Sequence, residues 1–556
     1  MNISEQTTNN NILNVSSYLK KMAQAQPYIR AVVYPAGRDK SGRVLYAHLT
    51  FEQLDRLSDI LAGGLARSGI RRGTRTILMV KQSPEFFALT FALFKIGAVP
   101  VMVDPGMGIR RMVRCFQESK PEGFIGIPVA HVVRTLYPKF FNTVKTWITV
   151  GRRWFWKGPT LQQICREPWQ PYPLADTRHN ETAAILFTTG STGPAKGVVY
   201  THGIFDAQIR HIRSHFGIVP GEIDLPTFPL FALFDPALGM TAIIPDMDPT
   251  RPALANPEKI IEAITDQGVT NMFASPALLN RVGSFGKQKE IKLLSLKRVI
   301  SAGAPVSPST IEQFASILSE EAEIHTPYGA TEAMPVTSIE SRELLTETRK
   351  HSEKGYGICV GRPVDGLEVC IIKISDDPID QWSNDLVMPD NEIGEITVRG
   401  EPVTRQYFER PAQGRLAKIK EGRAIWHRMG DLGWKDTKGR IWFCGRKSQR
   451  VITEKGILYT IPCEAIFNNH PQVFRSALVG VGPAPKQKPV ICIELKPGNK
   501  SPKKKQIKKE LLAMAALNEL TKGINTFFFH KAFPVDIRHN SKIFREKLAV
   551  WAEKKM

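Results

Sequence analysis

The chain has 556 residues, of which 42% are hydrophobic, so it is long enough for more than one folded unit and can bury large cores. Its seven cysteines are scattered singly, without a CxxC pair or a Cys/His cluster, which indicates a reducing compartment and argues against structural zinc. The formal net charge of +22 attracts anions such as nucleotides, coenzyme A, anionic lipid or nucleic acid, but composition alone does not choose among them.

The start of the chain and its most apolar stretch bear on membrane insertion. The N-terminus lacks the basic start and the apolar run of a secretory signal, so we expect a cytoplasmic protein whose residues 1–16 are frayed. Residues 86–103 form the most apolar stretch, but Lys95, Gly97 and Pro100 interrupt it. The stretch therefore predicts a helix capped at Gly97 and a buried strand, which complete a βαβ unit with the strand before them.

Two changes of pattern along the chain predict its domain organisation. Through about the first 360 residues, strand-like apolar runs alternate with helix-like periodic segments, as in layered α/β architecture. Short strand-like runs then dominate, and about the last hundred residues return to a mixed pattern. We expect a large N-terminal domain, residues 1–446, with a strand-rich subdomain at about 360–446, and a small C-terminal domain, residues 447–556.

The strongest chemical signal is the string LFTTGSTGPAKGVV at residues 186–199. Glycines let backbone N–H groups converge, hydroxyls add hydrogen-bond donors and a lysine adds positive charge, a combination suited to cradling phosphates. The spacing GxxGxxK differs from the Walker pattern. The candidate phosphate-binding residues are Thr188, Thr189, Gly190, Ser191, Thr192, Gly193 and Lys196.

This string resembles the phosphate loop of the adenylate-forming superfamily, which includes acyl-CoA synthetases, non-ribosomal peptide synthetase adenylation domains and luciferases. Further similar motifs follow in the family's order over nearly the whole chain. They are Lys95 to Ala98, Asp104-Pro105, Ser301 to Pro305, Tyr328 to Glu332, Gly430 to Gly433, Gly445-Arg446 and Pro534 to Leu548. The resemblance implies an α/β fold whose N-terminal domain contains layered sheets and a small β-barrel-like part, with a mobile α+β C-terminal domain.

The resemblance also implies which residues hold the adenosine part of ATP. Gly303, Ala304 and Pro305 belong to the segment that is similar to the family's adenine-pocket lining. Tyr328 and Gly329 begin a string that is similar to the YGxTE motif, in which the tyrosine ring stacks on the base. These residues are the expected nucleobase site.

The same resemblance places further groups around the phosphates and the sugar. It implies that Thr331 approaches the α-phosphate, that Lys196 adds positive charge and that Glu332 helps to hold Mg²⁺, an ion that prefers oxygen ligands. It further implies that Asp431 accepts hydrogen bonds from the ribose hydroxyls and that Arg446 contacts ribose or phosphate. ATP and Mg²⁺ are therefore expected at this site.

Two positions concern the C-terminal domain. Lys542 stands at the position of the family's catalytic lysine, although Ser541 replaces the glycine that usually precedes it. An ammonium there stabilises the charge that concentrates on the attacking carboxylate and the α-phosphate. Ser448 stands at the hinge position, where the family usually has aspartate or lysine, and this departure leaves the mechanics of domain rotation open.

The expected first half-reaction joins a carboxylate to ATP, giving an acyl-adenylate and pyrophosphate, with the enzyme supplying positioning and charge neutralisation. The second step is where the sequence departs from acyl-CoA synthetases. These usually place a histidine after a Pro-Leu-aromatic run, but the string FPLFALFDPALGM has Ala232 after Phe231 and Asp235 after Phe234. Residues 451–471 also replace the glycine-rich loop that usually admits a thiol.

Those two segments, together with residues 122–131 and 244–253, resemble one branch of the superfamily, the β-lactone synthetases of bacterial long-chain olefin biosynthesis. This implies a long-chain β-hydroxy fatty acid whose β-hydroxyl attacks its own acyl-adenylate, expels AMP and closes a four-membered lactone. Coenzyme A is then not required. Other enzymes of the olefin pathway are expected partners.

Two other functions stay open from the sequence. A long-chain fatty acid–CoA ligase has the same adenylation motifs and differs in its thioester product. A more remote alternative is a basic nucleic-acid-binding or membrane-binding protein with a relic fold. The complete motif set argues against that alternative, and we expect no nucleic acid partner.

Some features have more than one interpretation. The apolar candidates for the wall of an acyl pocket, each explained equally well by core packing, are Phe228, Phe231, Phe234, Met240, Phe273 and Pro276. The string GRRWFWKG at residues 151–158 is typical of peripheral membrane association, of partner docking or of aromatic packing against the core. The basic run at residues 500–509 is typical of a solvated loop and a helix start.

Overall fold

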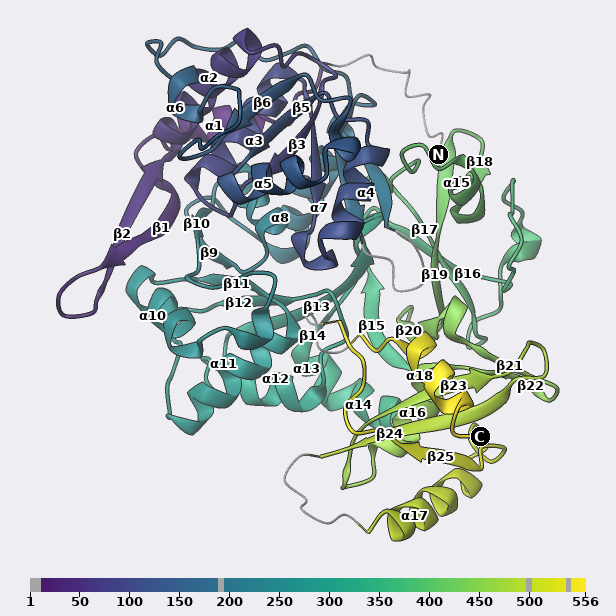
Figure 1. Ribbon diagram of the computed structural model, residues 1–556. Helices are drawn as coiled ribbons and strands as arrows, with labels where there is room; N and C mark the ends of the chain where they lie inside the picture. The colour runs from purple at the N-terminus through teal and green to yellow at the C-terminus, as the bar shows by residue number, and fades with distance from the viewer. Residues whose placement is uncertain (1–11, 189–194, 497–502, 537–541) are drawn as a thin grey trace, which may run out of the picture.

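The computed structural model of the chain describes residues 12–188, 195–496, 503–536 and 542–556 (Figure 1). The upper lobe in Figure 1 contains a sheet whose strands are parallel except at one edge, where the last pair is antiparallel. In spatial order, its strands are β6 (Thr146–Thr149), β5 (Gly123–Gly126), β3 (Arg75–Met79), β4 (Val99–Val103), β7 (Thr182–Thr188) and β8 (Lys196–Thr201).

Helices alternate with these strands along the chain, as the sequence pattern predicts. They are α1 (Ser17–Ala25), α2 (Phe51–Arg67), α3 (Pro84–Ile96), α4 (Ile109–Glu118), α5 (Pro128–Leu136), α6 (Leu161–Ile164) and α7 (His202–Phe216). The predicted βαβ unit is confirmed, because α3 ends at Ile96 and is capped by Gly97, whose φ of +76° is left-handed, and β4 pairs with β3 in parallel.

A second, larger sheet changes from parallel to antiparallel pairing along its width. In spatial order it contains β16 (Glu368–Ile372), β17 (Gly394–Arg399), β19 (Ala424–Lys435), β20 (Ile441–Arg446), β15 (Ile358–Pro363), β14 (Ala333–Glu340), β13 (Glu323–Ala330), β12 (Arg298–Ser301), β11 (Asn271–Ala274), β9 (Ile223–Pro226), β10 (Thr241–Ile243), β1 (Arg30–Arg38) and β2 (Val44–Thr50), with β18 (Lys418–Glu421) attached to β19. The strands from β13 to β16 pair antiparallel, so the strand-rich part that the sequence predicts continues the hydrogen-bond network of the parallel part.

Helices cover the parallel part of this sheet below the upper lobe in Figure 1. The helices between Pro229 and Ala417 are α8 (Pro229–Ala232), α9 (Phe234–Leu238), α10 (Pro257–Gln267), α11 (Pro276–Gln288), α12 (Pro308–Ala315), α13 (Ser341–Glu343), α14 (Arg349–Glu353) and α15 (Pro411–Ala417). The large N-terminal part is therefore a layered α/β structure, as expected from the sequence.

The C-terminal residues form a small unit around a three-stranded sheet of order β23-β24-β25. Its elements are β21 (Val451–Thr453), β22 (Gly456–Leu458), α16 (Thr460–Asn468), β23 (Val473–Val481), β24 (Lys488–Leu495), α17 (Lys504–Ala516), β25 (Thr526–Phe529) and α18 (Arg545–Glu553). This mixture of strands and helices agrees with the α+β unit that the family resemblance implies.

The connection to this unit is a short 3₁₀ turn, Lys447–Gln449, which contains the predicted hinge residue Ser448. On one side of Ser448, Lys447 Nζ lies 3.1 Å from Glu395 Oε2 in the N-terminal part. On the other side, Gln449 Oε1 accepts a hydrogen bond of 3.3 Å from Arg545 in the C-terminal unit. Ser448 thus separates two residues that are bonded to different parts of the protein, while its role as a hinge stays a prediction.

Residues 12–16 differ from the expected frayed end. The side-chain amide of Asn14 donates to the carbonyl oxygens of Phe94 and Ala175 at 2.8 and 3.1 Å, and the backbone N–H of Val15 donates to His202 Nδ1 at 3.2 Å. The expectation is wrong for these residues because a polar side chain satisfies buried carbonyl groups of the body. Residues 1–11 lie outside the described residues.

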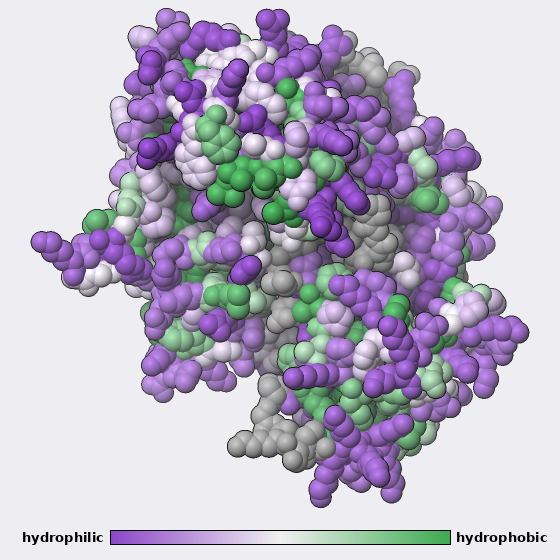
Figure 2. Space-filling view, in the orientation of Figure 1, coloured by the Kyte–Doolittle hydropathy of each residue, from purple (hydrophilic) through white to green (hydrophobic). Residues whose placement is uncertain are grey.

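The surface in Figure 2 is largely polar, with a group of apolar side chains on the upper lobe, on the face where Figure 1 places α5. Val129 and Leu136 of α5 have exposed fractions of 64% and 70%. In the part of the chain that the structure describes, no helix has the length and apolar character needed to cross a bilayer.

A buried lysine joins the two helices behind the sheet of the upper lobe. Lys95 of α3 is 1% exposed, and its Nζ lies 2.6 Å from Asp55 Oδ1 and 2.5 Å from Asp59 Oδ1, both on α2. The carbonyl oxygen of Asp55 accepts a third hydrogen bond from it, at 3.0 Å. The ammonium is therefore compensated, and α2 is held against the helix that packs behind β3 and β4.

We expect Lys95→Met to lower the stability of the upper lobe by about 3–5 kcal/mol, because it leaves two neighbouring carboxylates without their cation. The measurement is the midpoint of thermal unfolding. Lys81→Met, which changes an exposed lysine of the same segment, is the matched control and should leave the midpoint nearly unchanged. Equal midpoints for the two variants would contradict the assignment.

Candidate active site

The predicted phosphate loop connects two strands of the upper lobe. β7 ends at Thr188 and β8 begins at Lys196, and these two residues are paired across the antiparallel ladder. Lys196 Nζ lies 4.9 Å from the centre of the Tyr407 ring. The other predicted loop residues, Thr189, Gly190, Ser191, Thr192 and Gly193, lie outside the described residues.

A buried carboxylate connects two strands of the large sheet. Asp431 on β19 pairs with Arg446 on β20 in the strand register, and Arg446 Nη1 lies 3.0 Å from Asp431 Oδ1. The hydroxyl of Tyr328, on β13, donates a hydrogen bond of 2.6 Å to Asp431 Oδ2. The structure therefore brings together the predicted base-stacking tyrosine, the ribose carboxylate and the arginine.

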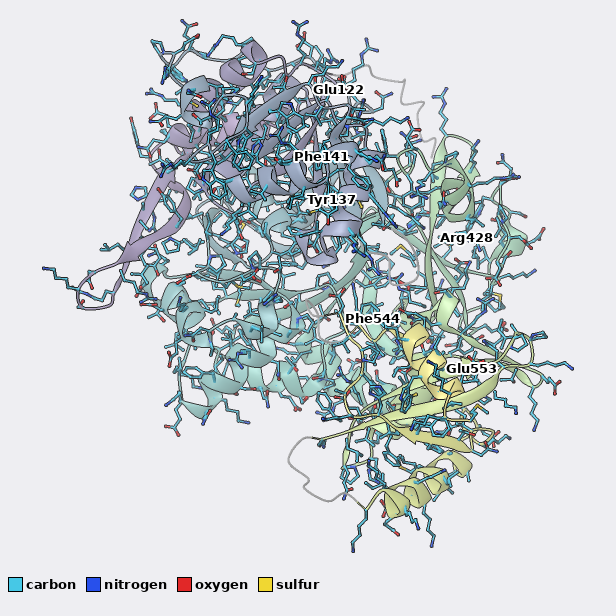
Figure 3. The ribbon with its side chains drawn as sticks, in the orientation of Figure 1. Glu122, Tyr137, Phe141, Arg428, Phe544 and Glu553 are labelled. Atoms are coloured by element: carbon cyan, nitrogen blue, oxygen red, sulfur yellow. The ribbon has the colours of Figure 1, made fainter. Side chains whose placement is uncertain are left out.

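The electrostatics of Asp431 extend this group to the C-terminal unit. Burial raises the pKa of its carboxyl, while Arg446, the Tyr328 hydroxyl and the Lys542 ammonium lower it. The Lys542 segment is held by a backbone hydrogen bond of 2.9 Å from Asp536 N–H to the Lys542 carbonyl. Figure 3 shows Phe544, two residues later, on the side of the unit that faces the N-terminal part. The charge of Lys542 therefore acts on the carboxyl group of the predicted ribose site.

Thr331 and Glu332 are held by two tyrosines from distant segments. The Tyr407 hydroxyl donates to Glu332 Oε1 at 2.8 Å, and the Tyr200 hydroxyl donates to the Thr331 carbonyl at 2.5 Å. The half-buried Glu332 carboxylate is the kind of oxygen ligand that Mg²⁺ prefers. No cluster of three or more metal-ligating side chains occurs among the described residues.

The predicted adenine segment follows β12 at the carboxyl end of the parallel strands. Gly303 has a φ of +95°, a conformation that favours glycine, and Ala304 and Pro305 follow it. On the next strand, a Cβ atom at Gly329 would lie 2.8 Å from the Ala333 carbonyl oxygen. Glycine is therefore needed at both positions for the backbone to take this course, at the edge where ligands bind in open α/β sheets.

The chain matches the family described as AMP-binding enzyme over residues 19–408. It is 48% identical to an olefin β-lactone synthetase of Xanthomonas campestris over 97% of this chain and 98% of the relative, and 49% identical to one of Stenotrophomonas maltophilia with the same coverage. This chain belongs to the AMP-binding enzyme family. Its fold is also that of the amide bond synthetase McbA from Marinactinospora thermotolerans, with a TM-score of 0.76 and 21% identity, over 97% of this chain and 99% of McbA.

Some acyl-pocket candidates of this AMP-binding enzyme are brought together. The rings of Phe231 and Phe273 stack with centroids 4.0 Å apart, and Phe228 lies 5.7 Å from Phe231. Phe234 instead packs near Phe205, at 6.3 Å. These contacts define an aromatic surface at the carboxyl end of β11.

Two further candidates occupy other positions. Met240 is 2% exposed and belongs to a core cluster with Phe94 and Ile209, so core packing accounts for it. Pro276 is buried in the first turn of α11.

The segment that departs from the acyl-CoA synthetase pattern carries a buried carboxyl pair. Asp235 of α9 and Asp224 of β9 share a hydrogen bond, and both are buried. Burial raises the pKa of Asp224 to about 7. Burial and the charge of Asp224 raise the pKa of Asp235 well above its usual value. The pair is therefore held together by at least one proton over much of the acidic to neutral range.

Several residues of this site were not identified from the sequence. Tyr200, Thr404, Tyr407 and Lys418 contact Thr331, Glu332 or each other, yet they belong to none of the motifs that carry the family resemblance. Their roles depend on contacts between distant segments, and no local spacing signals such contacts. The roles assigned to the motif residues stay predictions.

Replacement of Asp235 by asparagine should change the pH dependence of stability. Because folding disfavours ionisation of the pair, wild-type stability is greatest below about pH 4, the pKa of unfolded aspartate, and falls as the pH rises through the pKa of Asp224, about 7. We expect Asp235→Asn to raise the thermal midpoint by on the order of 2 °C at pH 8 and by less at pH 5.

Thermal unfolding at the two pH values checks this expectation. Asp377→Asn changes an exposed aspartate and is the control, which should give the same small shift at both pH values. If the thermal midpoint of Asp235→Asn rises as much at pH 5 as at pH 8, the carboxyl pair is not responsible for the pH dependence of stability.

Proposed function

We propose that this chain converts a long-chain β-hydroxy fatty acid into a β-lactone, with AMP and pyrophosphate as the other products. The observation that carries the proposal is the near full-length similarity to two olefin β-lactone synthetases. The site supports it, because Tyr328 and Arg446 contact the buried Asp431 carboxylate and the charge of Lys542 acts on the same group.

In the first step, a carboxylate oxygen of the fatty acid attacks the α-phosphorus of ATP, and the bond to pyrophosphate breaks. Asp431 accepts hydrogen bonds from ribose, while Arg446 and Lys542 stabilise negative charge on the phosphate and the attacking carboxylate. Glu332 would hold Mg²⁺, which supplies charge neutralisation at the phosphates when it is bound. Lys196 adds a further cation, so the residues mainly position reactants and compensate charge.

In the second step, the β-hydroxyl oxygen of the same molecule attacks the acyl carbonyl carbon. The bond between the acyl carbon and AMP breaks and the four-membered ring closes. The hydroxyl proton passes to a base, for which the departing AMP phosphate or solvent is sufficient. Because nucleophile and electrophile belong to one substrate, holding the chain in a bent conformation supplies a high effective concentration. The enzyme therefore does not need coenzyme A.

The region of the histidine that acyl-CoA synthetases usually have supports this choice. Ala232 is fully buried in α8, and the neighbouring Phe231 stacks on Phe273. The segment thus presents an apolar wall where a thiol-using relative has a titratable ring. An apolar wall suits a long alkyl chain.

Product analysis tests the proposal directly. With a long-chain β-hydroxy acid, ATP and Mg²⁺ but no coenzyme A, we expect stoichiometric AMP and a product lighter than the acid by one water, detected by mass spectrometry. The matched control is the same acid without the β-hydroxyl, which should form adenylate but no lactone. Release of AMP only when coenzyme A is added, with a thioester product, would instead establish a long-chain fatty acid–CoA ligase.

The role of Lys542 has a separate test. We expect Lys542→Ala to slow adenylation by roughly 100- to 1,000-fold, because the variant loses a cation that acts mainly on the transition state. The measurement is ATP–pyrophosphate exchange. Lys547→Ala changes an exposed lysine that lies over the Phe544 ring and is the control, expected to retain normal exchange. Undiminished exchange in Lys542→Ala would remove this lysine from the catalytic group.

A peripheral contact with a lipid surface is a subsidiary proposal, suited to a water-insoluble substrate. In the string at residues 151–158, Trp156 packs on His131 with ring centroids 5.0 Å apart, whereas Trp154 and Phe155 are 54% and 71% exposed. Exposed aromatic rings beside arginines are typical of interfacial contact. Contacts with other enzymes of olefin biosynthesis stay an expectation from the family resemblance.

A further inference from the structure

The segment Thr404 to Phe408, named here the 404–408 strap, runs along the strand that follows the phosphate loop. The Phe408 N–H donates to the Gly197 carbonyl at 2.7 Å, and the Val199 N–H donates to the Gln406 carbonyl at 3.3 Å. The strap is therefore attached to β8, the strand that begins at a predicted phosphate-binding lysine.

The other side of the strap holds Glu332. The Thr404 N–H and hydroxyl donate to the Glu332 carbonyl oxygen at 2.9 and 3.0 Å. The Tyr407 hydroxyl donates to the Glu332 carboxylate at 2.8 Å. Backbone and side chain of Glu332 are thus both fixed by one short segment, and that segment is fixed to β8.

Lys418, the first residue of β18, supports the strap from the interior. The residue is 7% exposed, and its Nζ donates to the Thr404 carbonyl oxygen and, at 3.3 Å, to the Thr404 hydroxyl oxygen. The Thr404 hydroxyl accepts from Lys418 and donates to the Glu332 carbonyl, so it has one orientation only. The hydrogen bonds form a directed chain from the lysine to the backbone of Glu332.

Two lysines lie close to the Tyr407 ring, so these hydrogen bonds are surrounded by the charges of the site. Lys196 Nζ and Lys418 Nζ lie 4.9 and 5.9 Å from the centre of the Tyr407 ring. Burial lowers the pKa of Lys418 to about 7, while the Glu332 carboxylate raises it and Lys196 lowers it. Burying a lysine without a carboxylate in direct contact destabilises the fold. If Lys418 served only to fill the interior, an apolar side chain would give a more stable protein.

We propose that Lys418 and Thr404 are positioning residues that hold Glu332, through the 404–408 strap, at a fixed place relative to Lys196 for binding of magnesium and nucleotide phosphates. The inference rests on the role proposed above for Glu332 as the magnesium ligand. Neither positioning residue needs to touch substrate. They act by fixing the position of the Glu332 carboxylate.

The principal variants change the hydrogen-bond chain while keeping side-chain volume. Lys418→Met removes the ammonium, and Thr404→Val removes the hydroxyl that connects the ammonium to the Glu332 carbonyl oxygen. Thr404→Ser restores the hydroxyl and is the rescue variant. Lys420→Met changes an exposed lysine two residues along β18 and is the matched control.

In ATP–pyrophosphate exchange, we expect Lys418→Met and Thr404→Val to raise the half-saturating Mg²⁺ concentration about 10-fold, because partners that orient a metal ligand contribute this much to metal affinity. The KM for the fatty acid should change less than about two-fold, since the acyl site is not contacted. Thr404→Ser and Lys420→Met should resemble the wild type.

A binding measurement separates metal affinity from turnover. With Mn²⁺ as the probe and α,β-methylene ATP as a nucleotide that cannot react, electron paramagnetic resonance gives the affinity of the ternary complex. We expect weaker Mn²⁺ binding in Lys418→Met and Thr404→Val by about the same factor as in the exchange assay.

The outcomes distinguish the inference from the proposal on which it rests. A lower thermal midpoint with unchanged Mg²⁺ and Mn²⁺ dependence in Thr404→Val or Lys418→Met would show that these residues are structural only. If Lys418→Met does not fold, the comparison of Thr404→Val with Thr404→Ser decides the matter. Unchanged metal dependence in Glu332→Gln would instead overturn the role proposed for Glu332 itself.

Discussion

The arrangement of the site depends on the compensation of one buried carboxylate, that of Asp431. Leaving such a group uncompensated in the interior costs on the order of several kcal/mol, so the cation and the hydroxyl that compensate it must be in place in the folded protein. Arg446 comes from the adjacent strand and Tyr328 from β13, with β14, β15 and β20 between β13 and β19 in the sheet. The carboxylate therefore fixes the antiparallel part of the sheet against the parallel part, and the predicted ribose site lies where they meet.

The predicted cations of the site come from distant segments of the chain. Lys196 follows the phosphate loop, Arg446 ends β20 and Lys542 belongs to the C-terminal unit. Their mutual repulsion opposes assembly until an anion is bound, and a nucleotide triphosphate supplies that anion. Asp431 and Glu332 partly offset the repulsion beforehand, as the effects of Arg446 and Lys542 on Asp431 indicate. In the proposed reaction, binding of the anionic nucleotide would relieve the remaining repulsion among these cations.

The sequence predicts those parts of the structure that depend on local signals. The helix from Pro84 and the strand after Gly97 follow from caps and apolar runs, and the family motifs place Tyr328 and Asp431 in one site because their order along the chain is shared. Contacts between distant segments have no such signal. The hydrogen bond from Tyr407 to Glu332 connects a segment that has no recognisable motif with the segment that carries the YGxTE-like motif. The hydrogen bond from Asn14 to the Phe94 carbonyl depends on a carbonyl group that becomes available only when the helix has formed.

The segment around α8 and α9 relates these differences to chemistry. An acceptor thiol needs a path to the acyl carbonyl, and a titratable histidine near that path is useful to it. In this chain the stack of Phe231 on Phe273 and the hydrogen bond between Asp235 and Asp224 close the same segment onto the sheet. For the proposed lactone synthesis, an apolar wall beside the adenylate would suit a long alkyl chain and favour attack by a hydroxyl already on the substrate. In the proposed reaction, the departures from the acyl-CoA synthetase pattern therefore lie at the second step, while the motifs expected to form the adenylate are kept.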